Sequence, residues 1–388
     1  MQLPVLPEPP FVEDELSGWA EWNRSEPYTV GMEEEVMLLE PGSWALAHCG
    51  DDVLGHLPRP LLDHATPETH QASIELATSP HHTVADTARE AAALRRAFLA
   101  ALEPLGLRAA SAGTHPRAVW NETQVSGGAR YQLVYESMRE LARREPTFAL
   151  HVHVGIDDPE RATTLHRRMR AHLPLLLAVS ANSPYWQGRD SGLASMRTPI
   201  FQGFPRVGIP RSFFCYAQYV EAIDQLLRCD AFPAPTFLWW DVRLQPSLGT
   251  VEVRIMDAQA TAAQSGALAA LVQTIAHLEL EVGYHDRRSI EAPELIDENR
   301  FLAARDGIDA LLIDPVRERR VPARQMLADL LAAGHDHAVQ LGCEDALGEL
   351  RAVTAESGAA RQRRLAGAWD LAGVTAVLAS RFAQPTPY

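Results

Sequence analysis

Three adjacent carboxylates interrupt the apolar stretch Tyr28-Thr-Val-Gly-Met-Glu-Glu-Glu-Val-Met-Leu-Leu39, which otherwise has the composition of a buried β-strand. Side chains alternate between the two faces of a strand, so Glu33 and Glu35 share one face while Glu34 points to the other. Two carboxylates on one buried face repel each other and lose hydration, and a divalent cation would offset both costs. Glu34 would need an ion-pair partner or solvent. The alternative is a solvated edge of the sheet, because runs of charge usually face water.

Two later segments place potential metal ligands among strand-forming residues. Glu75 lies in a second apolar strand, and Glu68 precedes it in the chain. Phe148–Gly155 alternates between apolar and polar residues, so His151 and His153 share one face. A lone histidine in a strand is usually structural, but two imidazoles at positions i and i+2 also suit a metal site.

A predicted β-hairpin supplies the last charged strand face. Phe237–Leu244 and Thr250–Met256 both alternate like strands, and Pro246–Gly249 has the composition of a turn between them. In the second strand Glu252 and Arg254 lie opposite three β-branched residues. The first strand carries three residues on one face, namely Trp239, Asp241 and Arg243.

The four strands together favour one shared site over four separate features. Their charged or imidazole groups are Glu33 and Glu35, Glu75, His151 and His153, and Glu252 and Arg254. Oxygen ligands with one or two imidazoles suit Mg²⁺ or Mn²⁺, and this many carboxylates predict two or more ions. Such clusters commonly hold a nucleoside triphosphate, whose charge the metals and arginines neutralise. The chain has no Walker loop, kinase glycine loop or G-x-G-x-x-G motif, which argues against a P-loop or Rossmann enzyme.

The remaining segments predict a helical scaffold and one long loop. Residues 1–27 are expected to form a surface arm, with a short helix around Glu13–Trp22. The loop over 182–211 is rich in Gly, Pro and aromatic residues, and long loops of this kind are often functional. It contains four arginines that could bind carboxylate or phosphate, although each taken singly is more often structural: Arg189, Arg197, Arg206 and Arg211. Helices are predicted at Thr83–Leu102, Arg130–Arg144, Pro159–Ser180, Phe213–Leu227, Gln259–Tyr284, Val321–Gly334, Asp345–Ser357 and Arg361–Phe382.

The composition is that of an ordinary folded protein, because 46% of the 388 residues are hydrophobic and 22% are charged. A net charge of -15 argues against a general nucleic-acid-binding protein and against a protein that binds anionic membranes. The four cysteines form no C-x-x-C pair, which favours reduced thiols over a zinc or disulfide framework. The chain shows neither a signal-like N-terminus nor an apolar run of about 18 residues, so a cytoplasmic protein without a membrane span is expected.

Five motifs occur in order along the chain: Thr29-Val-Gly-Met-Glu-Glu-Glu35, Ile74-Glu-Leu-Ala-Thr-Ser-Pro80, His151-Val-His-Val-Gly155, Ala181-Asn-Ser-Pro-Tyr-Trp186 and Leu248-Gly-Thr-Val-Glu-Val-Arg-Ile-Met-Asp-Ala-Gln259. Together they resemble the type 2 glutamate-cysteine ligase family, carboxylate-amine ligases of the glutamine-synthetase-like superfamily. The resemblance implies an α+β, glutamine-synthetase-like catalytic fold, in which a curved antiparallel sheet forms a funnel and helices pack on its outer face. It also implies a single catalytic domain over 28–388, whose part from about 260 to 388 is helical.

The resemblance further assigns roles to individual residues. The implied metal ligands are Glu33, Glu35, Glu75, His151 and Glu252, with Glu68 at the spacing of a further acidic ligand. His153 is implied in phosphate binding, and Arg254 is implied as the catalytic arginine that faces the transferred phosphate of ATP. The candidates for binding the substrate are Arg130, Ser183, Arg189 and Arg197.

The resulting hypothesis is an ATP-dependent ligase that joins glutamate, or a similar carboxylate, to an amine such as cysteine. It would form a γ-glutamyl amide through an acyl phosphate, using ATP and two or more Mg²⁺ or Mn²⁺ ions. A metal-dependent amide hydrolase is one alternative, and a non-catalytic homologue that binds nucleotide is another. The complete set of predicted ligands argues against the non-catalytic homologue. Small molecules rather than nucleic acid or membrane are the expected partners, and exposed sheet edges would permit association with a second copy.

Overall fold

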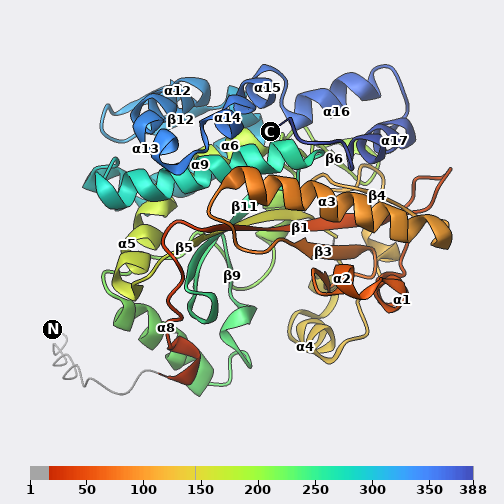
Figure 1. The fold of residues 1–388 in the computed structure, drawn as a ribbon, viewed down its shortest axis with the longest axis horizontal. Coiled ribbons are helices and arrows are strands. Elements are labelled where there is room, and N and C mark those ends of the chain that lie inside the picture. Colours follow the sequence, from red (N-terminus) through yellow and green to blue (C-terminus); the bar gives the residue numbers. More distant parts are fainter. Residues whose placement is uncertain (1–16, 145, 388) are drawn as a thin grey trace, which may run out of the picture.

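A seven-stranded antiparallel sheet lies at the centre of the structure (Figure 1), a computed structural model that describes residues 17–144 and 146–387. Its strands in spatial order are β10 (Val242–Gln245), β11 (Thr250–Asp257), β5 (Ala149–Gly155), β1 (Val30–Leu39), β3 (Ser73–Ala77) and β2 (Ala65–Pro67), while β4 (Arg108–Ala110) pairs with the end of β1. The predicted hairpin is confirmed, because β10 and β11 are antiparallel neighbours. Its turn requires glycine: Gly249 has a φ of +64°, and a Cβ there would lie 1.7 Å from the carbonyl oxygen of Asn23.

The outer face of the sheet is covered by two long helices, α3 (Val84–Leu102) and α9 (Ala262–Glu281), which cross it side by side in Figure 1. Val30 and Met32 of β1 are buried in the apolar core on this face. Glu34 shares the face, as the alternation predicts, and forms a buried ion pair with Arg95 of α3 at 2.7 Å. The predicted α+β class and the outer helical layer are therefore confirmed, and the other face of β1 is left for Glu33 and Glu35.

Four predicted helices are interrupted. The one predicted over Arg130–Arg144 changes from an α-helix to a 3-10 segment at Arg139–Arg143, and the one predicted over Asp345–Ser357 is divided at Glu349. The segment predicted as one helix over Pro159–Ser180 is divided into α5 (Pro159–Met169), a 3-10 turn at Arg170–His172 and α6 (Leu173–Ser180). Pro174 explains the break, because it lacks the N–H that would bond one turn back. The segment predicted as one helix over Arg361–Phe382 is two helices, α16 (Gly358–Ala366) and α17 (Leu371–Arg381), and the Asp370 side chain caps the second.

Shorter elements complete the fold. The remaining helices are α1 (Gly50–His56), α2 (Arg59–Leu62), α4 (Ala129–Met138), α7 (Arg197–Phe201), α8 (Tyr216–Arg228), α10 (Arg287–Ile290), α11 (Pro293–Asp306), α12 (Ala323–Ala333), α13 (His335–Leu341), α14 (Glu344–Gly348) and α15 (Leu350–Ala355). Three two-stranded sheets pair β6 (Tyr185–Trp186) with β7 (Arg189–Asp190), β8 (Val207–Gly208) with β9 (Trp239–Trp240), and β12 (Leu311–Asp314) with β13 (Arg319–Pro322). The β12–β13 hairpin was not predicted, because that part of the chain has a largely helical pattern.

The N-terminal arm is only partly within the described residues. Residues 1–16 lie outside them, and with them most of the helix predicted around Glu13–Trp22; Gly18–Ala20 forms a 3-10 turn. The Trp19 indole donates a hydrogen bond to Asp224 of α8 at 2.7 Å, so the end of the arm is attached to the body. One hydrophobic cluster in the described residues extends from Ala20 to Val353, and smaller clusters lie beside it, while the single domain stays a prediction. No helix in the described part of the chain combines the length and apolar character needed to cross a membrane.

Candidate active site

Strand register brings the predicted side chains face to face on the inner surface of the sheet. Glu35 of β1 is directly opposite Glu75 of β3, and on the other side of β1 Glu33 is opposite His151 of β5. One strand further, His153 is opposite Glu252 of β11. The alternation of each strand was visible in the sequence, and the antiparallel pairing converts it into one continuous cluster.

Glu33 lies at the centre of this cluster because it contacts both histidines. Its Oε2 is 3.1 Å from Nδ1 of His151, and its Oε1 is 3.3 Å from Nε2 of His153. Both imidazoles are buried. Within the described residues, Nε2 of His151 has no hydrogen-bond partner, and the contact between Nε2 of His153 and Glu33 lacks hydrogen-bond geometry. Buried ring nitrogens without partners are costly, so these atoms fit a site that binds a further group.

Three overlapping groups of side chains could each hold a metal ion, because the ligand atoms in each group lie within 4.8 Å of one another. The groups are Glu33 with His153 and Glu252, Glu33 with Glu75 and His151, and Glu35 with Glu68 and Glu75. Glu33 and Glu75 each belong to two groups, so their carboxylates could bridge neighbouring ions. The donor set is rich in oxygen with two imidazoles, which fits Mg²⁺ or Mn²⁺.

The electrostatics of the cluster show an excess of negative charge. Burial, and then the charge of Glu35, raise the pKa of Glu68 to about 7. Burial, and then the charge of Glu33, raise the pKa of Glu75 well above its ordinary value. Carboxyls that retain protons near neutral pH indicate that the local cations do not balance the carboxylates. A bound divalent ion would supply that balance, so the residues present fit the metals that the sequence predicts.

Two arginines flank the opposite end of the cluster. Glu252 is fully buried, with its Oε2 2.5 Å from Nε of Arg243 and its Oε1 in contact with Arg254. Burial alone would raise the pKa of Glu252, but the two guanidinium groups hold it well below the ordinary value. This predicted metal ligand is therefore already ion-paired, although its Oε1 is still 3.9 Å from Nε2 of His153. The arginines leave positive charge beside the carboxylates, an arrangement that suits phosphate.

A cavity of about 280 Å³ lies on the inner face of the sheet. Four of the clustered glutamates and the two arginines line it, namely Glu33, Glu35, Glu68, Glu75, Arg243 and Arg254. Two of the four residues predicted to bind substrate line it, and both already have partners. Arg130 of α4 donates to Oγ1 of Thr236 at 2.8 Å, and Arg197 donates to the carbonyl oxygen of Ile255 at 3.1 Å. Arg197 is buried, and its hydrogen bond to Ile255 stabilises β11.

The structure does not bring the other two candidates to the cavity. Ser183 is fully buried and donates to Oδ2 of Asp257 at 2.6 Å, away from the cavity. Arg189 is exposed on the short strand β7. Neither is among the described residues that line the cavity. Their loop composition suggested a binding role, but the loop folds so that one side chain supports the scaffold and the other faces solvent.

The cavity lining includes residues outside the predicted site, among them Arg243 and Tyr131. Arg243 lies opposite Glu252 in the β10–β11 register, so the strand pattern could have identified it. Asp241 belongs to the same predicted face but forms an ion pair with Arg300 at 2.8 Å instead of lining the cavity. Tyr131 reaches the cavity from α4 and donates its hydroxyl to the carbonyl oxygen of Pro67. No local sequence signal marks Tyr131, because its position depends on how α4 packs.

Sequence comparisons relate the chain to one family over most of its length. The family model described as glutamate-cysteine ligase family 2 (GCS2) matches residues 29–374. A relative from Rubrobacter xylanophilus is 38% identical over 342 residues, which cover 87% of this chain and 90% of the relative. Another from Sorangium cellulosum is 35% identical over 348 residues, covering 87% of this chain and 91% of the relative. Their names are "Putative glutamate--cysteine ligase 2-1" and "Putative glutamate--cysteine ligase 2", respectively.

Two solved structures have a similar fold at low sequence identity. The glutamate-cysteine ligase of Francisella tularensis, solved in complex with AMP, matches with a TM-score of 0.66 at 13% identity, covering 94% of this chain and 90% of that one. A bifunctional glutathione synthetase from Pasteurella multocida matches with a TM-score of 0.68 at 14% identity, covering 92% of this chain and 52% of that one. These likenesses concern the fold alone, and they confirm that the chain shares the α+β fold of these two proteins.

Proposed function

The chain belongs to glutamate-cysteine ligase family 2, and from that premise we propose that it is an ATP-dependent carboxylate-amine ligase that forms a γ-glutamyl amide. The observation that carries the proposal is the inner-face cluster, in which Glu33, Glu35 and Glu75 meet His151 beside Arg254. The AMP bound to the structurally similar ligase of Francisella tularensis supports nucleotide use at this fold. Glutamate and an amine such as cysteine are the proposed substrates.

The residues of the cluster divide into two sets. We assign the metals, Mg²⁺ or Mn²⁺, to the carboxylates and to the imidazole of His151, where the ions would neutralise phosphate oxygens. The assigned ligands are Glu33, Glu35, Glu68, Glu75, His151 and Glu252. His153, Arg243 and Arg254 border them and would bind the phosphates, since arginine pairs strongly with phosphate oxygens.

The reaction would proceed in two steps, phosphoryl transfer and then attack by the amine. The γ-phosphoryl group of ATP passes to the substrate carboxylate, which produces ADP and an acyl phosphate. The amine then attacks the acyl carbon, loses a proton and displaces inorganic phosphate, leaving the amide. Arg254 is positioned to stabilise the charge on the phosphoryl group in the first step. The partly enclosed cavity limits access of water, which would otherwise hydrolyse the acyl phosphate.

Release of ADP is the direct test of this proposal. The protein is supplied with ATP, Mg²⁺ and glutamate, and each of a panel of amines is added in turn. We expect ADP and phosphate to form only when a carboxylate and an amine are both present, and the amide product to be detected by mass spectrometry. If ATP neither binds nor turns over with any amine, the proposal is wrong. Metal-dependent cleavage of amides without ATP binding would favour the hydrolase alternative.

A further inference from the structure

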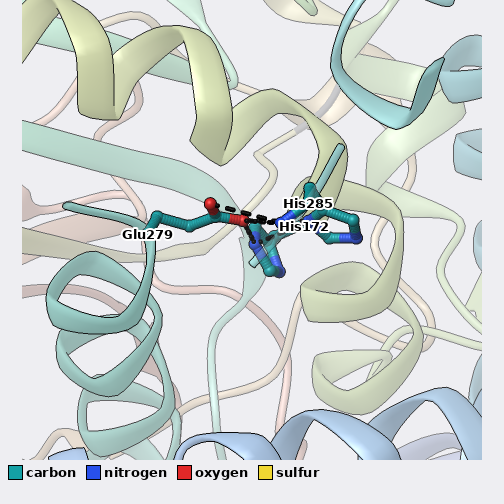
Figure 2. A group of neighbouring side chains, drawn as sticks. All are labelled: His172, Glu279 and His285. Atoms are coloured by element: carbon teal, nitrogen blue, oxygen red, sulfur yellow. Dashed lines mark hydrogen bonds and ion pairs between the residues drawn. The ribbon is translucent and has the colours of Figure 1, made fainter. Parts of the chain in front are cut away.

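A second cluster of potential metal ligands lies outside the candidate active site. Glu279 is in the last turn of α9, the helix that covers the outer face of the sheet. His172 is in the 3-10 turn between α5 and α6, and His285 is in the connection from α9 to α10. Figure 2 shows the three side chains converging from these separate segments. None of them is among the described residues that line the active-site cavity.

The three ligand atoms form a nearly equilateral triangle. Nε2 of His172 is 2.6 Å from Oε1 of Glu279, and Nδ1 of His285 is 3.0 Å from the same oxygen. The two ring nitrogens are 2.9 Å apart. An imidazole N–H points along one direction only, so hydrogen bonds satisfy at most two edges of such a triangle. An ion at the centre of the triangle would accept one lone pair from each of the three atoms, so all three atoms would then have a partner.

The surroundings hold Glu279 in the orientation that this cluster needs. Nε of Arg168 donates to the other carboxylate oxygen, Oε2, at 2.6 Å, and the same guanidinium donates to the carbonyl oxygen of His285 at 2.7 Å. Arg168 therefore connects the Glu279 side chain to the backbone that carries His285. Oε1 faces the two imidazoles and also accepts a hydrogen bond from the backbone N–H of His285 at 3.2 Å. Hydrogen bonds of this kind to the non-ligating oxygen commonly orient carboxylates in metal sites.

A cavity of about 550 Å³ lies against the cluster and gives it an open side. His172 and His285 are both in its wall, together with Tyr284 and Asp314. His172 and Glu279 are almost completely buried, whereas the His285 side chain is 20% exposed. An ion could therefore enter from the cavity and keep one coordination position directed into it.

We propose that His172, Glu279 and His285 form a binding site for a divalent transition-metal ion of the zinc class, with its fourth position open to this cavity. Two imidazoles with one carboxylate suit Zn²⁺ and its neighbours in the periodic table better than Mg²⁺. In a tetrahedral site with bonds of about 2.0–2.1 Å, neighbouring ligand atoms are about 3.3 Å apart. The edges of the observed triangle, 2.6, 2.9 and 3.0 Å, would have to lengthen by about 0.3–0.7 Å. The ion would link the end of α9 to the α5–α6 turn and to the segment before α10.

Binding of Co²⁺ to the whole protein tests the proposal without any measurement of ligase activity, so its failure and the failure of the proposed function are separate results. Metal-free protein in excess Mg²⁺ is titrated with Co²⁺ and followed by visible absorption and calorimetry. We expect one tightly bound equivalent with the intense visible bands of four-coordinate Co²⁺, displaced by Zn²⁺. If no Co²⁺ binds in excess Mg²⁺, the proposal is wrong.

Variants locate the bound ion. His285→Ala should weaken Co²⁺ binding by about 100-fold or more, since even partners of metal ligands contribute 10- to 100-fold. His277→Ala is the matched control, because His277 is also on α9 and its Nδ1 lies 2.7 Å from Nδ1 of His337, but it is not in the cluster. Glu33→Gln controls for binding at the inner face. Both controls should bind Co²⁺ as the wild type does.

Two outcomes would overturn the assignment, namely undiminished binding by His285→Ala or loss of binding in either control. Circular dichroism establishes that each variant is folded. If His285→Ala does not fold, His285→Cys replaces it, since a thiolate is also a zinc-class ligand. His285→Cys should keep the ion and add a sulfur-to-cobalt charge-transfer band. Binding without that band would contradict the site.

Discussion

The two faces of the central sheet differ in how the charge of their buried carboxylates is balanced. On the outer side Glu34 is neutralised by Arg95. On the inner side the carboxylates exceed the cations, and burial together with the neighbouring carboxylates raises the pKa values of Glu68 and Glu75. The difference shows that charge balance, rather than burial alone, separates Glu34, which supports the fold, from Glu68 and Glu75, which are available to bind ions.

The largest expected effect comes from removing the carboxylate at the centre of the inner face. Glu33→Gln should lower the kcat/KM of metal-dependent ATP use by roughly 100-fold or more, because a metal ion supplies several kcal/mol of charge stabilisation. Steady-state ADP release measures this loss. The melting temperature should stay close to that of the wild type, and activity near the wild-type level would contradict the assignment of Glu33.

Glu34→Gln should have the opposite pattern. It leaves the Arg95 guanidinium buried without its counter-charge, which should lower the free energy of unfolding by about 3 kcal/mol. Urea denaturation measures the loss, and ATP use per folded molecule should be unchanged. The double variant Glu34→Gln with Arg95→Met should recover part of the stability, because the unpaired charge is then removed. Equal losses of catalysis from Glu33→Gln and Glu34→Gln would invalidate the distinction between the faces.

The pH dependence of metal affinity sharpens the same comparison. Glu68 has a raised pKa of about 7, so below that pH its carboxyl holds a proton that a metal ion must displace. The apparent affinity for Mg²⁺ should therefore fall as the pH falls from 7 to 5, by up to about tenfold per pH unit for one proton. In the absence of metal, the stability of the fold depends on pH in the opposite direction. A carboxyl whose pKa is raised in the folded protein contributes less to the free energy of unfolding as the pH rises from its pKa in the unfolded chain toward 7.

Isothermal titration with Mg²⁺ at several pH values measures this dependence. Glu68→Gln is the matched variant, because it removes the titrating carboxyl and should flatten the slope. An affinity that is independent of pH between 5 and 8 in the wild type would show that the inner carboxylates do not compete for protons.

The smallest expected effect distinguishes two arginines that the sequence treated alike. Arg130 lines the inner cavity, so Arg130→Ala should raise the KM for the carboxylate substrate. An increase of about tenfold corresponds to the loss of one exposed charge-assisted hydrogen bond. Arg189→Ala should leave the KM unchanged, because this side chain is exposed outside the cavity. Kinetics with varied glutamate measure both values, and a larger effect from Arg189→Ala would contradict the placement of the substrate.

Much of the inner face could be predicted because strand alternation is a local property. Glu33 and Glu35 were assigned to one face and Glu34 to the other before any partner was known, and the register agrees with that assignment. His151 and His153 follow the same rule. The motif order was equally informative, since it predicted the family that the comparisons identify.

Ser183 and Arg189 do not line the cavity, because the composition of a loop does not specify where its side chains point. The break before α6 had a signal in Pro174, whereas the position of Tyr131 had none, since it depends on how one helix packs over the sheet.

By itself, the sequence determined the α+β class, the strands and the face on which each charged side chain lies, because a two-residue period is encoded in neighbouring positions. Tertiary structure decided which of those charges are balanced. Arg95 reaches Glu34 from 61 positions away, and His172 reaches Glu279 from 107 positions away. Charge compensation acts through space, so no local pattern records it. That is why the inner cluster could be predicted from its strands, whereas the His172, Glu279 and His285 cluster emerged only when the chain was folded.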